Sequence, residues 1–295
     1  KVRPFKGPLL IWARTVVWKI GRWKSRELKE FVDAFAPDLL FIPIYYSHYI
    51  HDINFWIKNR CGIPAVGYIS DDNYSLRKIS FNPLFWIDRL IMRRRLRKVF
   101  AACDIVYTIS ENQKEYLRQR FGDKFKVLTK YAEFDKSNKP AGFRPHVPLR
   151  MLYTGNLGSG RYSSIGLIVK ALRQVNVHEQ RIVFDIYTST VLSEKLRSRL
   201  NTAETTLHDA VSFEKVLELQ RRADILVHVE GLSLKERLDV AHSFSTKIVD
   251  YLQQCKPIFV VGKDDCASIR YFTDNDSGIV AQNYDEIVRK LTAVA

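Results

Sequence analysis

Two segments in the second half of the chain carry residues whose types and spacing suit an anionic ligand. The first runs from Gly155 to Arg161 with the sequence Gly-Asn-Leu-Gly-Ser-Gly-Arg, after an expected strand and before an expected helix. Glycines let backbone N–H groups approach a ligand closely, and a helix N-terminus adds the positive end of the helix dipole. Gly155, Asn156, Gly158 and Arg161 therefore suit a phosphate group, with a tight turn that binds nothing as the alternative. The spacing matches neither the dinucleotide-binding motif nor the P-loop, which disfavours dehydrogenases and P-loop enzymes.

The second segment begins at Ser243 and contains a lysine and an aspartate at helical spacing. We expect Ser243 or Ser245 to cap the helix and, with Thr246 beside them, to leave N–H groups for an anion. Lys247 and Asp250 are three residues apart and share one helix face. The lysine could hold a diphosphate while the carboxylate accepts hydrogen bonds from two ribose hydroxyls, and a surface ion pair is the alternative.

A third segment, Leu84 to Phe100, carries six basic residues and one acid among large apolar side chains. A cationic amphipathic helix with aromatic residues suits a membrane interface, where each basic residue contributes about 1 kcal/mol near an anionic leaflet. The alternative is a helix that buries its apolar stripe and leaves its arginines in water. The residues expected to contact a membrane or an acceptor are Trp86, Arg93, Arg94, Arg95, Arg97 and Lys98.

Four stretches, in order along the chain, resemble the large retaining family of GT-B glycosyltransferases that includes many bacterial polysaccharide enzymes. The stretch from Ser245 to Ile258 reads Ser-x-Lys-x-x-Asp-Tyr-Leu-x-x-x-Lys-Pro-Ile and is similar to the family's donor-binding helix. Tyr153–Leu157 resembles the first strand and turn of the family's C-terminal domain, and Ala223–Val227 resembles its Ala-Asp element with the strand that follows. Asp104–Glu111 resembles the end of the family's N-terminal domain. The resemblance covers about residues 38–290.

The resemblance implies roles for individual residues of the second half. Asp250 stands where the family has the glutamate that binds the nucleotide ribose, and Lys247 and Arg161 match its donor-phosphate cations. Cys255 replaces the usual glycine before Lys-Pro. The ligand implied is a nucleotide-sugar co-substrate whose base is not assigned, with no further cofactor and no metal.

The resemblance also implies where catalytic groups would lie. The family often has a second glutamate eight residues before the ribose-binding one, facing the donor sugar, and this position is His242 here. The family's N-terminal domain often has a His-Asp pair after a strand, whereas the matching strand here is followed by Ser70, Asp71 and Asp72. Asp71, Asp72 and His242 are therefore the catalytic candidates. Helix-capping or loop carboxylates are the alternative for the two aspartates, and no general base is identified.

The elements that must position these residues alternate between helix and strand along the whole chain. Trp12–Phe35 is expected to be one helix, and later apolar runs separated by helical segments predict parallel strands. Asp135–Pro148 is rich in turn residues and breaks the pattern. We therefore expect two Rossmann-like α/β domains of the GT-B type, an N-terminal domain over 1–137 that is incomplete and a C-terminal donor domain over 149–295, joined by a linker over 138–148. In such sheets, ligands bind outside the carboxyl ends of the strands.

The charge of the chain is concentrated in its first half. The 295 residues carry 47 basic and 32 acidic side chains, a net charge of +15. Residues 1–149 hold 28 of the basic and 14 of the acidic ones (+14), which leaves 19 and 18 (+1) for the rest. Such an imbalance points to an anionic partner for the first half. The four cysteines form no C-x-x-C pair, which disfavours zinc and disulfide frameworks, and no apolar run is long enough to span a membrane.

The leading hypothesis is a metal-independent glycosyltransferase, held at the cytoplasmic face of a membrane, that moves a sugar from a nucleotide donor to a polysaccharide or lipid-linked acceptor. One alternative is a catalytically idle GT-B subunit that supports an active partner. Another is a basic protein that binds nucleic acid, although no recognised nucleic-acid-binding module is present in the sequence.

Overall fold

The computed structural model describes residues 8–132 and 146–295. The chain divides into two compact units, Lys1–Thr129 (unit 1) and Lys130–Ala295 (unit 2). The expected domain boundary at residue 137 and most of the expected linker, 138–148, lie outside the described residues. Among the described helices, none is both long and apolar enough to cross a membrane.

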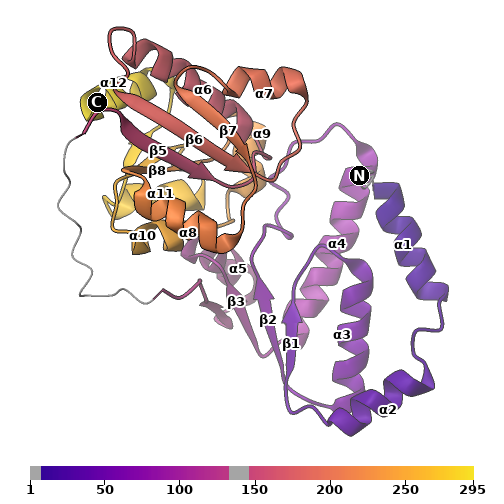
Figure 1. The fold of residues 1–295 in the computed structure, drawn as a ribbon. Coiled ribbons are helices and arrows are strands. Elements are labelled where there is room, and N and C mark those ends of the chain that lie inside the picture. Colours follow the sequence, from indigo (N-terminus) through magenta and orange to yellow (C-terminus); the bar gives the residue numbers. More distant parts are fainter. Residues whose placement is uncertain (1–7, 133–145) are drawn as a thin grey trace. The chain divides into compact units, whose positions relative to one another are not determined.

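Unit 1 is built on a four-stranded parallel sheet with the strand order β1-β2-β3-β4 (Figure 1). Residues on β1, β2 and β3 pack against α4 and α5 to form one buried core, in which Leu96, Phe100 and Val106 are almost inaccessible to water. The strands are β1 (Leu40–Pro43), β2 (Ala65–Ile69), β3 (Ile105–Thr108) and β4 (Phe125–Val127). The helices are α1 (Pro8–Ile20), α2 (Arg26–Phe35), α3 (His48–Cys61), α4 (Pro83–Ala102) and α5 (Glu111–Phe121).

The prediction of one continuous helix over Trp12–Phe35 is wrong, because α1 ends at Ile20 and α2 starts at Arg26. Ser25 has extended backbone angles, and its hydroxyl accepts a hydrogen bond from the N–H of Leu28 at 3.2 Å. A serine at this position satisfies one of the N–H donors that every helix start leaves unpaired. The end of α1 and the segment after it contact α3 through the ring pairs Trp18–Tyr49 and Trp23–Trp56.

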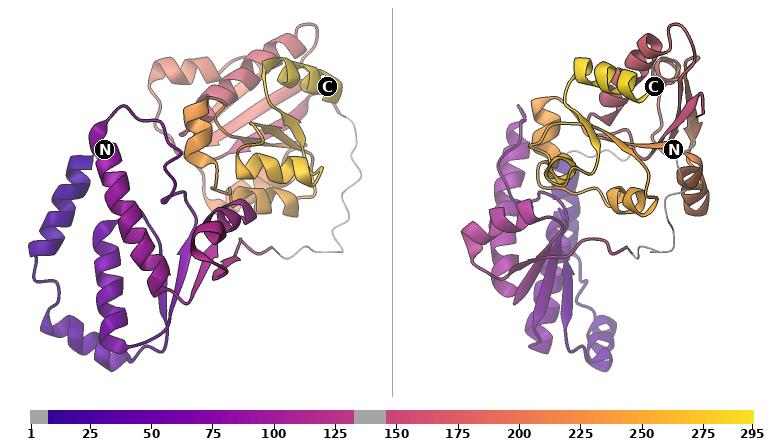
Figure 2. Two further views of the ribbon diagram at one scale, coloured as in Figure 1. Left: turned by 180° about the vertical axis from the view of Figure 1, so that it is seen from behind. Right: turned by 90° about the vertical axis from the view of Figure 1, so that its left-hand side faces the viewer.

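Unit 2 is built on a six-stranded parallel sheet with the strand order β10-β9-β8-β5-β6-β7. Helices cover both faces (Figure 2): α6, α7 and α12 pack on one face, and α8, α10 and α11 on the other. The strands are β5 (Leu149–Thr154), β6 (Ile182–Thr188), β7 (Thr205–Asp209), β8 (Ile225–Val229), β9 (Ile258–Val261) and β10 (Ile279–Ala281). The helices are α6 (Arg161–Val175), α7 (Glu194–Leu200), α8 (Phe213–Arg222), α9 (Leu234–Val240), α10 (Lys247–Gln253), α11 (Ala267–Asp274) and α12 (Tyr284–Val294). The two units thus confirm the predicted fold class of two parallel-sheet α/β domains.

A buried carboxylate, Asp88 of α4, ties several segments of unit 1 together. It accepts hydrogen bonds from the indole N–H of Trp12 on α1 (2.7 Å) and from the hydroxyl of Tyr46 (2.7 Å). The Nε2 atom of His48, at the start of α3, lies 3.1 Å from the same carboxylate. Burial alone would raise the pKa of Asp88, but the hydrogen bonds from His48, Tyr46 and Trp12 outweigh it and keep the pKa below its ordinary value.

We therefore expect Asp88→Ala to destabilise unit 1 by about 2–4 kcal/mol, since three donors lose their buried acceptor. Urea unfolding followed by tryptophan fluorescence measures this, because all five tryptophans of the chain lie in unit 1. Asp123→Ala is the control: it removes an exposed carboxylate that pairs with Arg118 at the surface, and it should cost less than about 1 kcal/mol. Equal losses in the two variants would contradict the role given to Asp88.

Candidate functional site

The candidate site of unit 2 lies where two neighbouring strands of the sheet end. β5 pairs in parallel with β8, so their carboxyl ends lie at the same edge of the sheet. Gly155 follows β5, and Glu230 follows β8. Two helices bring cations to this edge, because Arg161 is the first residue of α6 and Lys247 the first residue of α10.

Arg161, which is partly exposed, and the buried Glu230 form an ion pair at the centre of the site. The guanidinium Nη2 of Arg161 lies 2.8 Å from Oε2 of Glu230, and its Nε donates to the same oxygen at 3.1 Å. The side chain of Glu230 is only 3% exposed. Burial raises the pKa of Glu230, while the charges of Arg161 and Lys247 act in the opposite direction. The pair fixes the guanidinium at the edge of the sheet.

Lys247 is the second cation of the site. Its ammonium donates to the carbonyl oxygen of Thr154 at 3.1 Å and lies 4.5 Å from the centre of the Tyr153 ring. Burial and the neighbouring charge of Arg161 lower the pKa of Lys247 to about 8. Lys247 is therefore mostly charged at neutral pH and loses its charge as the pH rises past about 8.

Gly155 leaves the space that Lys247 occupies. Its φ angle is +155°, a backbone conformation that side chains rarely adopt, and a Cβ atom built there would overlap the ammonium of Lys247. The other glycine of the turn with a positive φ, Gly160 (φ +81°), is similarly covered by the carboxylate of Glu236. These two glycines allow the side chains of α9 and α10 to lie directly over the turn.

Several N–H groups of the turn are already hydrogen-bonded within unit 2, although we had expected them to be available to a ligand. The N–H of Gly155 donates to the carbonyl of Tyr187, and the N–H of Gly158 donates to the side chain of Asn156. The N–H of Arg161 donates to the carbonyl of Gly158 at 3.1 Å. In this structure the side chains of Arg161 and Lys247, rather than these amides, are the groups placed to hold an anion.

The prediction that Ser243 or Ser245 caps the second helix is wrong. The cap of α10 is Thr246, whose side chain makes no capping hydrogen bond, and the N–H of Ser245 donates instead to the hydroxyl of Ser268 at 3.0 Å. Packing of the segment against α11 thus determines where α10 begins. Asp250 lies one turn into the helix, mostly buried, and forms an ion pair with Lys130.

His228 is a further residue of the site, and sequence reasoning missed both it and Glu230. His228 lies within β8, is fully buried, and has its Nε2 atom 3.6 Å from Oε1 of Glu230. Burial, followed by the charges of Lys247 and Arg161, lowers the pKa of His228 well below its ordinary value, so the ring is neutral. The available signal was a histidine and a glutamate at the carboxyl end of an otherwise apolar strand.

The catalytic candidates of unit 1 have different environments. Asp71 is exposed, whereas Asp72 is buried and accepts hydrogen bonds from the N–H and hydroxyl of Ser75. Burial alone would raise the pKa of Asp72, but Lys78, Ser75 and Arg89 outweigh it and lower the pKa. This carboxylate is therefore engaged within the fold.

The third catalytic candidate, His242, is 8% exposed and lies between α9 and α10 of unit 2. His48 and His51, which follow β1, are also buried. Burial lowers the pKa of His51 to about 4, so this ring is neutral at neutral pH.

The basic helix α4 directs its charged side chains in two directions. Arg93 donates to the carbonyl of Tyr74 and stacks on its ring, Arg97 donates to the Tyr74 hydroxyl, and Arg95 pairs with Asp52. In the same helix, the indole of Trp86 donates to the carbonyl of Ser80. A second set of side chains is exposed along one face of α4, namely Ile87, Leu90, Ile91, Arg94 and Lys98.

Comparison with solved structures identifies the fold. The chain is similar to the GtfA/B complex, with a TM-score of 0.61 and 13% identity over 90% of this chain and 52% of the other. It is also similar to the pneumococcal O-GlcNAc transferase GtfA in complex with UDP and GlcNAc, with a TM-score of 0.57 and 14% identity over 90% of this chain and 51% of the other. The α,α-trehalose 6-phosphate synthase from Burkholderia multivorans matches with a TM-score of 0.59 and 10% identity over 87% of this chain and 63% of the other.

These matches confirm that the chain has the fold of the GT-B glycosyltransferases. The chain spans about half of the length of the first two structures. In sequence, no protein-family model and no curated protein matches it. Because a fold can host several functions, the activity has to be argued from the site.

Two glycines on either side of the site offer a test of its geometry. Gly155→Ala should displace Lys247 and destabilise unit 2 by about 1–3 kcal/mol, because the Cβ atom needs the space of the ammonium and the backbone conformation is strained. Gly166→Ala in α6 is the matched control, since a Cβ atom there contacts nothing within 4 Å, and it should raise stability by up to about 1 kcal/mol. Urea unfolding followed by far-ultraviolet circular dichroism measures both. Equal stability of the two variants would argue against the close packing of Lys247 on the turn.

Proposed function

We propose that this chain acts in a glycosyltransferase that moves a sugar from a nucleotide-diphosphate donor to a polysaccharide or glycolipid acceptor. The observation that carries the proposal is the pair of cations, Arg161 and Lys247, gathered around Glu230 at the carboxyl ends of β5 and β8. Binding outside the carboxyl ends of strands is the rule for doubly wound sheets. The presence of UDP in the similar GtfA structure supports a nucleotide donor for this chain as well.

The two cations would act on the leaving group of the reaction. The bond between the anomeric carbon and the diphosphate oxygen breaks, a bond from the same carbon to an acceptor hydroxyl oxygen forms, and the hydroxyl proton is released. Negative charge develops on the departing diphosphate, where the guanidinium of Arg161 and the ammonium of Lys247 would stabilise it. Because these side chains supply the positive charge, we propose a metal-independent reaction without a further cofactor. We propose retention of configuration at the anomeric carbon solely because the sequence resembles a retaining family.

Asp250 is proposed to bind the ribose. It lies one helical turn after Lys247, so a donor whose diphosphate contacts the lysine could extend its ribose toward this carboxylate. A carboxylate can accept hydrogen bonds from two neighbouring hydroxyls. In this structure the carboxylate is paired with the ammonium of Lys130, which the ribose hydroxyls would have to replace or share.

We further propose that the acceptor is bound at a membrane surface and that unit 1 faces the anionic leaflet. The exposed face of α4 supports this, because apolar Ile87, Leu90 and Ile91 are followed by the cations Arg94 and Lys98. A helix face that combines exposed apolar and basic side chains is typical of helices that lie in a membrane interface. The cytoplasmic face of the membrane is the side that carries anionic lipids.

One observation favours a second candidate, a donor-binding subunit that has no activity of its own. Asp72, a catalytic candidate, is buried and engaged with Ser75 and Arg89. Release of free nucleotide from a nucleotide sugar distinguishes the two functions: turnover supports the enzyme, and binding without turnover supports the subunit.

The donor site is tested by calorimetric titration with UDP, GDP, ADP, CMP and dTDP. We expect one of them to bind, and at 100 times its dissociation constant it should stabilise unit 2 by about 2.7 kcal/mol. Asp250→Ala should weaken binding roughly tenfold or more through the loss of the ribose hydrogen bonds. Asp285→Ala, which removes an exposed carboxylate from the first turn of α12, is the matched control and should bind as wild type does. Failure of every nucleotide to bind would contradict the proposed function.

Nucleotide binding should also depend on pH through Lys247. Its pKa is about 8, so its charge is present below pH 8 and is lost as pH rises. Affinity for the nucleoside diphosphate should therefore fall about tenfold between pH 7.5 and pH 9, a range in which the terminal phosphate, with a pKa near 6, stays fully ionised. Lys247→Arg should flatten the profile, because arginine keeps its proton. Lys170 lies over the Tyr284 ring in the same unit and serves as the control. Lys170→Arg should show the same fall in affinity with pH as the wild type. A wild-type affinity that does not change with pH would count against Lys247 as an anion ligand.

A further inference from the structure

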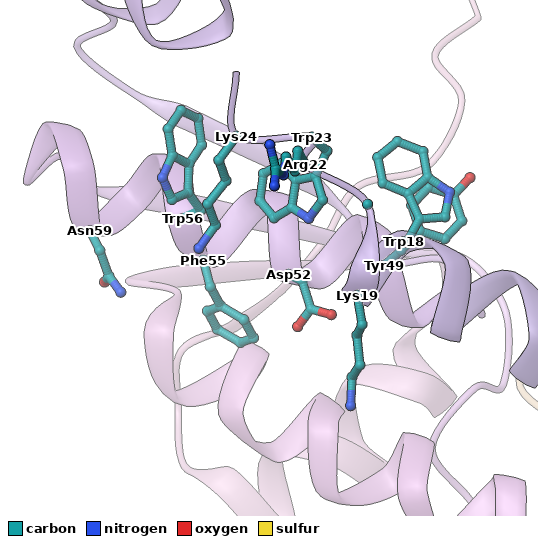
Figure 3. A pocket seen from close by; sticks show the side chains of 11 residues that line it. Trp18, Lys19, Arg22, Trp23, Lys24, Tyr49, Asp52, Phe55, Trp56 and Asn59 are labelled. Atoms are coloured by element: carbon teal, nitrogen blue, oxygen red, sulfur yellow. The ribbon is translucent and has the colours of Figure 1, made fainter. Parts of the chain in front are cut away.

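A pocket of about 740 Å³ lies in unit 1, between the end of α1 with the segment after it and one side of α3 (Figure 3). The first wall is formed by residues 18–24, and the second by residues 49–59. The second wall runs along the length of α3, whereas a ligand at the carboxyl edge of the sheet would meet only the start of that helix. The volume is within the range of small-molecule sites and is large enough for more than one sugar ring.

Aromatic rings line the pocket and are held in place by one another. Trp18 stacks on Tyr49, with ring centres 4.6 Å apart and planes 8° from parallel. Trp23 meets Trp56 edge to face at 5.7 Å. Each of these four side chains stays partly exposed, and Phe55 lies among them. These ring contacts restrict the rotamers of the four side chains, which reduces the entropy lost on binding.

Polar groups of two kinds share this pocket. Lys19, Arg22 and Lys24 are exposed cations on one wall, and Lys24 lies 5.2 Å from the centre of the Trp23 ring. The opposite wall carries Asp52 and Asn59 from α3. Figure 3 shows Arg22 and Lys24 beside the rings of Trp23 and Trp56, Asp52 between the walls, and Lys19 and Asn59 farther out.

Asp52 forms an ion pair with Arg95 of α4, which fixes the position of its carboxylate. A carboxylate accepts hydrogen bonds from hydroxyl groups, and an asparagine amide both donates and accepts them. The cations on the other wall attract an anionic substituent. Aromatic faces, hydroxyl-binding groups and cations are thus present within one small space.

We propose that this pocket binds a sugar ring that carries a phosphate. The apolar face of the ring packs on the tryptophans, its hydroxyls meet Asp52 and Asn59, and the phosphate meets Lys19, Arg22 and Lys24. The proposal uses only residues of unit 1 and stands whether or not unit 2 binds a nucleotide. Within the proposed function, this pocket would hold part of a phosphorylated or lipid-linked glycan away from the reacting atoms.

Tryptophan fluorescence tests this pocket directly, because three of the five tryptophans of the chain line it. We expect glucose 1-phosphate to quench the emission in a saturable way, and to bind at least tenfold more tightly than glucose or inorganic phosphate. An alkyl ester of glucose 1-phosphate distinguishes the two sources of the ligand. Binding as tight as that of the free compound indicates a lipid-linked sugar, and weaker binding indicates a soluble one. Quenching by glucose 1-phosphate no stronger than by inorganic phosphate, or quenching only by phosphatidylglycerol vesicles, would overturn the proposal.

The double variant Arg22→Ala with Lys24→Ala should weaken binding of glucose 1-phosphate at least tenfold. Both side chains are exposed and lie outside the helices, so the variant should fold. Arg120→Ala is the matched control, since it also removes a cation from an aromatic ring of unit 1, that of Tyr116 at 3.8 Å. Unchanged binding in the double variant would refute the role of the cations. Lys247→Met should leave the quenching unaltered, which separates this site from the proposed donor site of unit 2.

Discussion

The ion pair between Arg161 and Glu230 is the interaction on which the candidate site depends. At the edge of the unit 2 sheet, Arg161 and Lys247 are partly buried, and burying a cation without a counter-charge is costly. Glu230, placed by the end of β8, offsets that cost for Arg161 at 2.8 Å and raises the pKa of Lys247 against the effects of burial. His228 is neutral, and the two cations face a single carboxyl group, Glu230, whose pKa burial raises. The cluster thus keeps a net positive charge that a bound anion would balance in a low-dielectric setting, where such attraction is strong.

The fold was largely predictable because its signals are local. The segment from Leu84 to Phe100, expected to be helical, lies within α4 (Pro83–Ala102), since Asn82 caps the helix, Pro83 suits its first position, and Cys103 ends it in extended backbone. The break between α1 and α2 was missed although it contains Gly21 and the capping residue Ser25, which are local signals for the end and the start of a helix. The strand β7 (Thr205–Asp209) is not recognisable from an apolar run, because it is a polar edge strand in which Leu207 is the single large apolar residue and it lacks the alternation that identifies strands.

The site was only partly predictable because its contacts are distant in sequence. Glycines before a helix and a lysine at helical spacing pointed to Gly155, Arg161 and Lys247, which the structure does bring together. Glu230 is 69 residues from its partner Arg161, and no local pattern links them. The expected N–H cradle of the turn failed as a prediction of geometry, since acceptors such as the Tyr187 carbonyl come from a neighbouring strand. Acceptors within the turn, Asn156 and Gly158, and one across the sheet, Tyr187, together decide which of these donors remain for a ligand.

The large positive charge of the first half likewise does not identify which residues can hold an anion. Composition counts every arginine as a candidate for an anionic partner, but burial and pairing remove several from that set. Arg89 is 4% exposed and donates to the backbone carbonyls of Asp72 and Ser75. Arg95 forms an ion pair with Asp52. Two of the places where cations stay exposed are the face of α4 with Arg94 and Lys98 and the segment after α1, while others, such as Arg77 and Lys126, are scattered over unit 1. Since electrostatic attraction between exposed charges fades within about 10 Å at ordinary ionic strength, these local groups, and not the total, decide which anion unit 1 can hold.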